Sequence, residues 1–475
     1  MSDQSKVISE LAVRRQRLND KVEGPILLMG NGLQARNLPM VSLPFRQDST
    51  FLYFSGCHEP DAALLWCGQR WTLYLPTPGA EDALWHGPTP SLERRGAELG
   101  FDHVRSSDEL QRDVAEVVRE SGLSTLAVSD ESRNQLASWW SGTPLKFGQQ
   151  HGSAELVAAV IELRRTKSDA EISALRQAAE HSAAAHVAVA QAARPGSSEA
   201  SLASLFQSVL SSRGCVTGYD TILTAQGEVL HQRGHEGVLR AGDLLLVDGG
   251  GEVKSGYTAD ITRTWPIGGP LSGRKRAAYD AVLRAQLSAI DLCRVGVRFR
   301  EVHDAACRVL IEFLISEGLL RCDAEESMTS GAHGVFFPHG IGHHLGLDVH
   351  DLENFGDLPS YPEGASRPEP FGTRFLRLDL PLQANWVVTV EPGLYAAPSI
   401  IHDEALRARL GDRINWAAAE QWIGLGGIRI EDDVAVTADS PDVLSASTPK
   451  SLEALETLVG AGPTVEERFG VSWSA

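Results

Sequence analysis

The sequence predicts a two-domain protein of the α/β (α+β) class, whose carboxyl-terminal domain consists of two similar halves. The chain has 475 residues, which exceeds what one hydrophobic core usually supports. Its first part alternates short apolar runs with helical patterns, as α/β domains do. Its second part runs twice through the same order of elements, and such repetition indicates two structurally related units.

The amino-terminal part predicts one complete α/β domain. Apolar runs at 24–29, 62–66 and 71–75 predict strands, and 107–111 has a helical pattern. No constellation of catalytic residues stands out in this part. A polar stretch at 148–152 precedes a helical segment, and we place the boundary after that segment, near Thr166-Lys167-Ser168, which predicts domains 1–166 and 167–475.

The first half of the second domain opens with Ser168-Asp169-Ala170-Glu171, which has the spacing of a capping box. This box predicts the start of a long Ala-rich helix that ends at Arg194-Pro195-Gly196. A second helix is predicted to end at Arg213-Gly214. Three predicted strands follow, at 218–223, 244–248 and 257–265.

The second half repeats this order. A long helix is predicted over about 272–293, and a second helix ends at Glu317-Gly318. A histidine-rich stretch at 336–350 comes next, followed by apolar strand patterns at 386–391 and 427–433. The domain is therefore expected to contain two helix-helix-strand-strand-strand halves.

Composition excludes several classes of function. With 43 basic and 62 acidic side chains the formal charge is −19, which repels phosphate backbones and anionic membranes. Nucleic acid and membrane partners are therefore not expected. The six cysteines form no C-x-x-C pair, and the first six residues include Asp3 and Lys6 where a signal peptide is apolar. These features predict a soluble cytoplasmic protein.

Five of the fifteen histidines fall within 333–350. Three glycines there, Gly340, Gly342 and Gly346, each weaken a helix by about 1 kcal/mol relative to alanine, so a strand or tight loop is expected. Gly340 also stands where the helical zinc motif of metalloproteases needs a glutamate. Any one of these histidines alone would be explained by burial and hydrogen bonding.

The repeat pairs four acids. Asp248 and Glu391 end corresponding strands of the two halves, and Asp260 and Glu431 occupy matching places in the third strands. If a pseudo-two-fold axis relates the halves, the four carboxylates converge, and they cannot all stay ionised without cations. A pair of metal ions resolves that conflict. With His343 as the one nitrogen ligand, the set suits manganese, iron(II), cobalt or magnesium better than a thiolate-type zinc site.

These segments resemble the metallopeptidases of the pita-bread fold, in particular aminopeptidase P and prolidase. The resemblance covers nearly the whole chain. Residues 45–56 are similar to the signature of the aminopeptidase P amino-terminal domain. The segments similar to the family's metal-binding motifs are 256–264, 339–343, 390–395 and 427–432.

The resemblance implies roles for individual residues. Asp248 would chelate one metal, Asp260 and Glu431 would bridge both, and His343 with Glu391 would hold the other. Two divalent ions per chain are expected, with Mn(II) favoured and Co(II), Fe(II) or Zn(II) as alternatives. Residues near the metals but not on them would be His231 and His350, while His339 and Arg429 would shape the substrate pocket.

The implied reaction is hydrolysis of the bond between an amino-terminal residue and a following proline by a metal-bridged hydroxide. Glu391 would carry the proton to the leaving nitrogen, and His231 and His350 would stabilise the developing charge. The expected substrates are peptides with proline in the second position. The family also implies a homo-oligomer, either a dimer or a tetramer.

The chain departs from the family in two places. The spacing from Asp248 to Asp260 is one residue longer than usual, and the glycines at 249–251 could absorb the extra residue as a bulge. The segment 353–385 is longer than in compact members, and its 371–380 portion, the later 413–416 stretch and His343-His344 are closer to bacterial prolidases.

Two alternatives remain open. A prolidase would use the same chemistry on Xaa-Pro dipeptides only, and it would need a group that recognises the carboxylate behind proline. A metal-free relative that serves as a binding module would have lost metal ligands, whereas all five are present here. Creatinase-like hydrolases lack the set, and methionine aminopeptidase lacks the amino-terminal domain.

Overall fold

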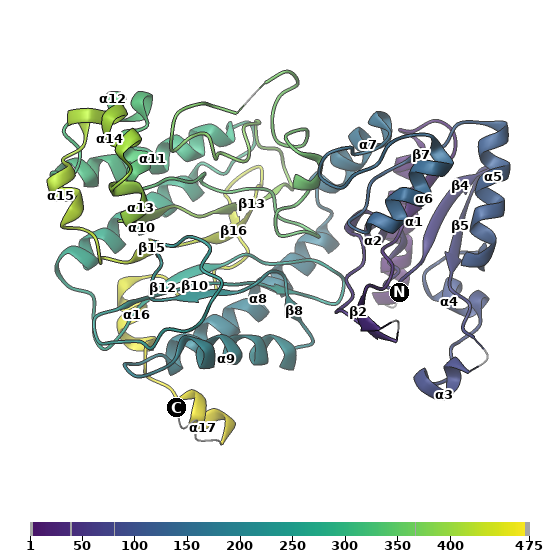
Figure 1. Cartoon of the computed structure of the whole chain (residues 1–475), viewed down its shortest axis with the longest axis horizontal. Helices are drawn as coiled ribbons and strands as arrows, with labels where there is room; N and C mark the ends of the chain where they lie inside the picture. The colour runs from purple at the N-terminus through teal and green to yellow at the C-terminus, as the bar shows by residue number, and fades with distance from the viewer. Residues whose placement is uncertain (1–2, 39, 80, 366, 471–475) are drawn as a thin grey trace. The chain divides into compact units, whose positions relative to one another are not determined.

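The computed structural model describes residues 3–38, 40–79, 81–365 and 367–470 (Figure 1). Met1 and Ser2, which belong to the start expected to lack a signal peptide, lie outside the described residues. The chain divides into two compact units: Met1–Arg165 with Leu352–Pro359, and Thr166–Asp351 with Ser360–Ala475. We call them the amino-terminal and carboxyl-terminal units. The expected domain boundary between 166 and 167 remains a prediction about which parts fold independently.

A five-stranded sheet of order β6-β5-β4-β1-β7 organises the amino-terminal unit. Its central strand β4 lies between β5 and β1, and β1 pairs antiparallel with β4 and parallel with β7. Strands β1, β4 and β5 form at the three apolar runs of the sequence, as predicted. The side chains of these runs, such as Leu27 and Met29, fill the core beside the sheet. The bounds are β1 Ile26–Met29, β4 Ala63–Cys67, β5 Arg70–Leu75, β6 Val104–Ser106 and β7 Ser124–Thr125.

Helices accompany this sheet. The predicted helical pattern at 107–111 begins as a 3-10 turn, Ser107–Glu109, and continues as α5, Leu110–Glu120. The described helices of this unit are α1 Asp3–Asn19, α2 Ser49–Ser55, α3 Asp82–His86, α4 Leu92–Glu98, α5, α6 Glu131–Ser141 and α7 Ala154–Arg165. A small hairpin joins β2 Ala35–Leu38 to β3 Val41–Ser42.

The first half of the carboxyl-terminal unit follows the predicted order. Helix α8, Asp169–Ala192, begins at the predicted capping box, in which Ser168 and Glu171 each satisfy the other's backbone N–H. Helix α9 covers Glu199–Ser212. The strands β9 Ile222–Thr224, β10 Leu244–Asp248 and β12 Thr262–Pro266 form a sheet of order β12-β10-β9, and β8 Val216–Thr217 pairs with β11 Gly251–Glu252.

The second half repeats it with helices α10, Gly273–Asp291, and α11, Phe299–Ser316. Figure 1 shows the strands of this unit between the pair α10 and α11 and the pair α8 and α9. The strands are β13 Val387–Val390, β16 Asp432–Ala435 and β17 Asp442–Val443 in one sheet, and β14 Gly393–Tyr395 with β15 Gly427–Arg429 in a hairpin. The shorter helices are α12 Ala324–Ser330, α13 Pro398–Ile401, α14 Glu404–Leu410, α15 Trp416–Glu420, α16 Leu452–Leu458 and α17 Val465–Phe469.

Three predicted strands are shorter than expected, and the first of them, 218–223, becomes a strand only at Ile222. The run 257–265 becomes a strand only at Thr262, and the run 427–433 is interrupted between β15 and β16. Asp260 and Glu431 therefore precede strands and do not lie within them. The reason is that the two segments bond to each other: the Glu431 N–H donates to the Thr262 carbonyl at 3.0 Å, and the Asp260 N–H donates to the Asp433 carboxylate at 3.2 Å.

The histidine stretch forms turns rather than a strand. Its only ladder contact among the described residues is an isolated antiparallel bridge between His344 and Val388. In the glycine hairpin after Asp248, a side chain at Gly250 would place its Cβ 1.7 Å from the Ala259 carbonyl oxygen. Glycine is therefore required there, because the two arms of the connection approach too closely for any larger residue.

A buried ion pair joins the two halves. Arg263 of β12 donates to Asp432 of β16 at 2.8 Å, and both side chains are fully buried. Burial alone would raise the pKa of Asp432, but Arg263 and Lys450 outweigh it and lower the pKa to about 2. The Arg263 guanidinium also donates to the Thr448 and Glu431 carbonyls. Every charge in this contact is thus paired and hydrogen-bonded, as buried ions require.

We expect Arg263→Met to lower the free energy of unfolding of the carboxyl-terminal unit by about 3 kcal/mol, because Asp432 would lose a buried partner. Urea unfolding followed by circular dichroism measures the effect. The control is Arg276→Met, which removes a pair with Glu456 at 3.1 Å whose side chains are about half exposed; exposed pairs contribute about 1 kcal/mol or less. Equal shifts of the two midpoints would contradict the prediction.

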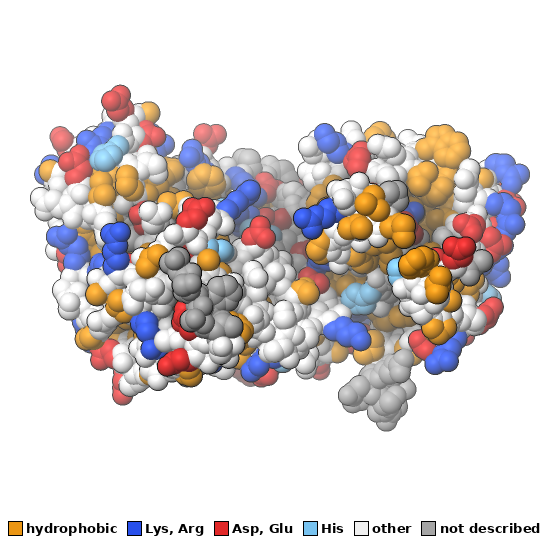
Figure 2. Space-filling view, turned by 60° about the horizontal axis from the view of Figure 1, so that its bottom comes forward, with side chains coloured by type: hydrophobic (Ala, Val, Ile, Leu, Met, Phe, Trp, Pro, Cys, Tyr) orange, Lys and Arg blue, Asp and Glu red, His pale blue; other side chains and the backbone are white. Residues whose placement is uncertain are grey.

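The surface carries both signs of charge. Figure 2 shows acidic and basic side chains interspersed over the face in view, with no continuous basic stripe on it. Among the helices of the described residues, none is long and apolar enough to cross a bilayer.

Candidate metal centre

The five side chains predicted to bind metal lie together in the carboxyl-terminal unit. Asp248 is the last residue of β10, and Glu391 directly follows β13. Asp260 and Glu431 stand just before β12 and β16, and His343 lies in the turns of the histidine stretch. We call this set the acidic centre: Asp248, Asp260, His343, Glu391 and Glu431.

The ligand atoms of the acidic centre form two overlapping groups. One oxygen each of Asp248, Asp260 and Glu431 lie within 4.8 Å of one another, as do atoms of His343, Glu391 and Glu431. His343 Nε2 lies 3.4 Å from an oxygen of Asp260 and 3.7 Å from one of Glu391. Because Glu431 belongs to both groups and Asp260 borders both, the set suits two ions that share carboxylates.

The orientation of His343 is fixed by the chain itself. Its Nδ1–H donates to the His344 carbonyl at 2.9 Å, so in the neutral ring the lone pair lies on Nε2, which faces the carboxylates. Metal-binding histidines commonly have their second nitrogen held in this way. His343 is also only 2 % exposed, which leaves its ring little freedom to turn.

Burial and mutual repulsion raise the pKa of Asp248, Glu391 and Glu431, whereas contacts with His343 and Tyr219 outweigh burial and lower the pKa of Asp260. Burial raises the pKa of Glu431 well above its ordinary value, and the charges of Asp260 and Glu391 raise it further. Burial likewise raises the pKa of Glu391 to about 8 against the pull of Arg429. Cations placed among these oxygens would relieve the repulsion. The donor set, four carboxylates and one imidazole, therefore fits hard divalent ions.

Tyr219 was not singled out in the sequence, yet it touches both aspartates of the first half. Its hydroxyl lies 2.6 Å from Asp248 and 2.5 Å from Asp260. Burial and these two carboxylates raise its pKa well above 10, so the group remains a hydrogen-bond donor. A single aromatic residue in a predicted strand carries no signal that could have revealed this role.

The two predicted pocket residues are linked through Tyr395. The Tyr395 hydroxyl lies 2.8 Å from His339 Nε2 and accepts from Arg429 at 3.1 Å. Arg429 also donates to Asp248 and to the Thr262 hydroxyl. The structure therefore places Arg429 directly on the acidic centre, where its positive charge partly offsets the carboxylates. Tyr395 lies in the segment 390–395, which resembles a metal-binding motif of the family, but its contacts with His339 and Arg429 depend on the tertiary structure.

A cavity of about 670 Å³ opens onto the acidic centre, and His231, His339 and His350 line it. The His350 ring lies 4.2 Å from that of His343, and one of its nitrogens lies within 4.8 Å of ligand atoms of Asp260 and His343. His231 is exposed and lies in the cavity wall, outside the metal-ligand groups of the described residues. Arg377, from the long 353–385 segment, is a further lining residue that the sequence did not single out.

Comparison with known proteins shows what kind of chain this is. Residues 173–438 match metallopeptidase family M24, and residues 11–126 match the amino-terminal domain of aminopeptidase P. The first match spans more than half of the chain. The chain belongs to metallopeptidase family M24. The predicted family resemblance is therefore confirmed, and with it the predicted fold of an M24 domain preceded by an amino-terminal domain.

Individual M24 proteins resemble the chain over nearly their full length. A probable Xaa-Pro aminopeptidase PEPP of Ajellomyces capsulatus (strain G186AR) is 34 % identical over 463 residues, which cover 95 % of each chain. Aminopeptidase P of E. coli with the inhibitor Pro-Leu is 29 % identical, with a TM-score of 0.78 and coverage of 95 % and 98 %. Pseudomonas aeruginosa aminopeptidase PepP is 28 % identical, with a TM-score of 0.79 and coverage of 96 % and 98 %.

Proposed function

We propose that this M24 protein is an Xaa-Pro aminopeptidase, which removes an amino-terminal residue that precedes proline. The observation that carries the proposal is the acidic centre at the end of a cavity lined by His231, His339 and His350. The relative named as a probable Xaa-Pro aminopeptidase matches 95 % of the chain, a share that must include most of the amino-terminal unit. This match supports the activity over that of single-domain members of the family.

The proposed ligands are the five residues of the acidic centre. Asp260 and Glu431 would be shared between the two ions, Asp248 would bind one of them, and His343 with Glu391 would bind the other. When bound, two divalent ions supply a hydroxide nucleophile and polarise the peptide carbonyl. We propose Mn(II), because carboxylate oxygens outnumber nitrogen four to one and no sulfur is present. Co(II), Fe(II) and Zn(II) are the alternatives.

The remaining chemistry falls to residues of the chain. Glu391 borders the cavity and lies 3.8 Å from His339, so it can accept a proton during attack and deliver it to the leaving nitrogen. His231 and His350 face the same space and can donate hydrogen bonds to the oxygen on which negative charge develops. Because His350 is proposed to act in catalysis and not as a metal ligand, the variant His350→Ala is expected to lose activity while it keeps its metal content.

His339 is suited to bind substrate without carrying charge. Burial, reinforced by Arg429, lowers its pKa to about 3, and its ring packs edge-on against Phe337 at 4.9 Å. The neutral His339 ring lines the cavity, and the buried Phe337 packs against it. The His339 ring can therefore provide a wall for proline, whose own ring fixes φ and whose nitrogen carries no hydrogen. The pocket can thus recognise the proline ring by shape rather than by hydrogen bonds to its nitrogen.

Prolidase activity is the second candidate, and Arg377 is the observation that favours it. A dipeptide ends in a carboxylate just behind proline, and burying that charge without a partner costs several kcal/mol. Arg377 lines the cavity together with His339 and Glu391. Its guanidinium could pair with such a carboxylate in bidentate fashion.

The deciding experiment compares kcat/KM for an Xaa-Pro-Yaa tripeptide with that for the matching Xaa-Pro dipeptide. We expect the tripeptide to be cut after its first residue at least as efficiently. A dipeptide preference of about a hundredfold, equal to about 2.7 kcal/mol in transition-state binding, would assign the protein to prolidase. In that case Arg377→Ala should remove the preference, whereas Arg374→Ala should not, since Arg374 is exposed and lies outside the cavity lining.

Further parts of the proposal rest on the family and on composition. We propose a cytoplasmic location, domains 1–166 and 167–475, and a homo-oligomer, either a dimer or a tetramer, whose mass can be measured by light scattering. A binding module without catalysis is the remote alternative. It is disfavoured because the five ligands are all present, and hydrolysis of any Xaa-Pro peptide by the purified protein would exclude it.

A further inference from the structure

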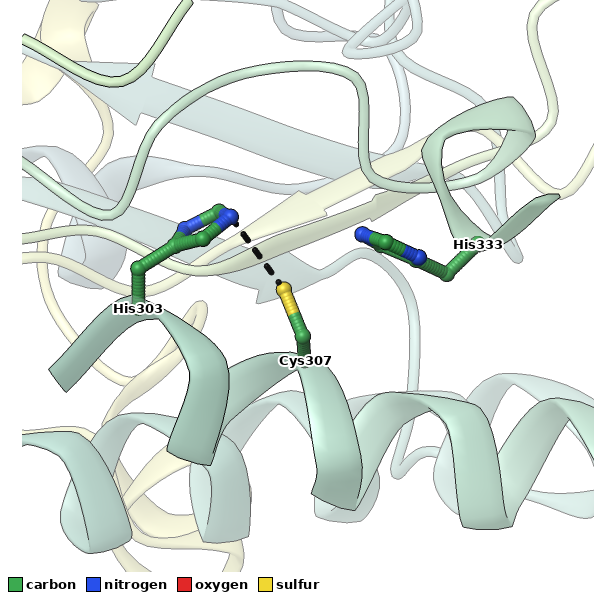
Figure 3. A group of neighbouring side chains, drawn as sticks. All are labelled: His303, Cys307 and His333. Carbon is green, nitrogen blue, oxygen red and sulfur yellow. Dashed lines mark hydrogen bonds between the residues drawn. The ribbon is translucent and has the colours of Figure 1, made fainter. Parts of the chain in front are cut away.

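Three other potential metal ligands meet in a separate place. His303 and Cys307 lie one turn apart on the same side of α11, and His333 lies in the 3-10 turn Ala332–Val335. All three side chains are fully buried. Figure 3 shows the His303 ring and the Cys307 sulfur side by side, with the edge of the His333 ring directed toward them.

The spacing of these groups is close to that of a metal site. Cys307 Sγ lies 3.4 Å from His303 Nε2, and one ligand atom from each residue lies within 4.8 Å of the others. Ligands 2.0 to 2.3 Å from a tetrahedral zinc ion lie roughly 3.5 Å from one another. Cys307 and His303 already have this separation. His333 would need to approach them by at most about 1.3 Å, the difference between the 4.8 Å limit and 3.5 Å.

The state of His333 also suits a ligand. Its Nδ1–H donates to the Ser327 carbonyl at 3.1 Å, so Nε2 carries the lone pair. That nitrogen has no hydrogen-bond partner within the part of the chain that the structure describes. The backbone beside it belongs to Gly372, where a Cβ would lie 3.2 Å from Nε2. Glycine therefore keeps this side of the imidazole uncrowded.

The hydrogen bond between Cys307 and His303 accounts for the placement of these two side chains, but it does not account for the buried His333 beside them. A buried acceptor left without a partner, such as His333 Nε2, costs about 1–3 kcal/mol, and an apolar residue of similar size would avoid that cost. Burial lowers the pKa of His303 to about 3 and also lowers the pKa of His333, so both rings stay neutral, as ligands must be. A soft ion would use His333 Nε2, which is one of two ring nitrogens of this group without a hydrogen-bond partner in the described part of the chain; the other is His303 Nδ1.

We propose that His303, Cys307 and His333 bind one zinc ion, at a site that shares no ligand with the acidic centre. On binding, the Cys307 S–H bond breaks, its proton leaves to solvent, and the thiolate forms the Zn–S bond. His303 and His333 supply nitrogens, and a water molecule takes the fourth position. Thiolate with imidazole is a donor set that favours zinc over manganese.

The role of this ion is structural. It links α11 to the turn that leads directly into the histidine stretch. The Phe337 ring lies 5.6 Å from His303 on one side and 4.9 Å from His339 on the other. Fixing His303 and His333 therefore fixes the aromatic ring against which the pocket residue His339 packs.

Co(II) provides a spectroscopic probe for the proposed site. The full-length protein is first saturated with Mn(II) and then titrated with Co(II). The acidic centre contains no sulfur, so near-ultraviolet thiolate-to-cobalt charge transfer must come from a cysteine. We expect the band to reach its maximum at about one equivalent per chain, as a single site requires, and to be absent in Cys307→Ser.

Cys293→Ser is the matched control. Cys293 is as fully buried as Cys307, but its sulfur contacts the Ala289 carbonyl and it belongs to no metal-ligand group of the described residues. The band should persist in this variant. Absence of the band in the wild type, its survival in Cys307→Ser, or its loss in Cys293→Ser would overturn the proposal.

X-ray absorption gives a test that needs no substitution. In wild-type protein saturated with Mn(II) and given one equivalent of Zn(II), we expect a sulfur scatterer at about 2.3 Å from zinc. A zinc environment of nitrogen and oxygen alone would show that the ion went to the acidic centre or the surface, and the proposal would be wrong. Neither readout depends on peptidase activity, so failure here is distinguishable from failure of the proposed enzyme function.

Discussion

Removal of divalent metal abolishes hydrolysis of Xaa-Pro peptides, and Mn(II) or Co(II) restores it. This result is expected because the residues of the acidic centre cannot by themselves provide a nucleophile at neutral pH. Glu391, with its pKa raised to about 8, can relay a proton but does not supply a hydroxide. The measurement is kcat/KM before chelation, after dialysis against chelator, and after readdition of each ion, with metal content determined in parallel.

A ligand variant makes this prediction specific to the acidic centre. Asp260→Asn removes a carboxylate that lies 3.4 Å from His343 and should lower both metal content and activity. Asp220→Asn is the control, because Asp220 lines the same cavity but is exposed and belongs to none of the metal-ligand groups. Full activity in a dialysed sample with less than about 0.1 metal per chain, far below what a two-ion reaction needs, would contradict the prediction.

His350→Ala lowers kcat by about 10² or more while metal content stays unchanged. Such a loss is usual when a donor that stabilises transition-state charge is removed. The His350 ring lies 4.2 Å from that of the proposed ligand His343 and borders the cavity. In the proposed mechanism it therefore lies near the reacting carbonyl and is not a metal ligand. Steady-state kinetics and metal analysis on the same preparations test both halves of the statement.

The alternative outcome is informative because His350 could reach a metal ion. One of its nitrogens lies within 4.8 Å of ligand atoms of Asp260 and His343. If the variant loses an ion, His350 is a ligand and our assignment is wrong. His235→Ala is a suitable control, since this imidazole bonds to the Leu223 carbonyl at 3.2 Å and lies outside the cavity lining; its kcat should not change.

The sequence was sufficient to predict the elements that carry strong local signals. The capping box at Ser168 and Glu171 sets the start of α8, and β10 has the bounds that its apolar run predicts. The repeated order of these elements was enough to predict that the four acids lie close together. Such signals are local or periodic, and both can be read from one chain.

Other features depend on contacts between distant segments and could not be predicted. The strands at Asp260 and Glu431 are interrupted because the two segments bond to each other across the halves. The contacts of Tyr219 with two aspartates, and of Tyr395 with His339 and Arg429, depend on tertiary structure. No local pattern distinguishes these tyrosines from ordinary core residues, because their partners are far away in the chain.

The hydrogen bonds that join the two halves of the carboxyl-terminal unit have a consequence for biosynthesis. The hydroxyl of Thr262 reaches Glu431 across 169 positions of the chain, and Arg429 reaches Asp248 across 181. Contacts of such long range form late, because a large loop must close before they contribute. A nascent chain therefore cannot assemble the acidic centre until its last strands have left the ribosome. The full set of five proposed ligands exists only once these contacts have formed, so two-ion binding at this centre is expected to follow their formation.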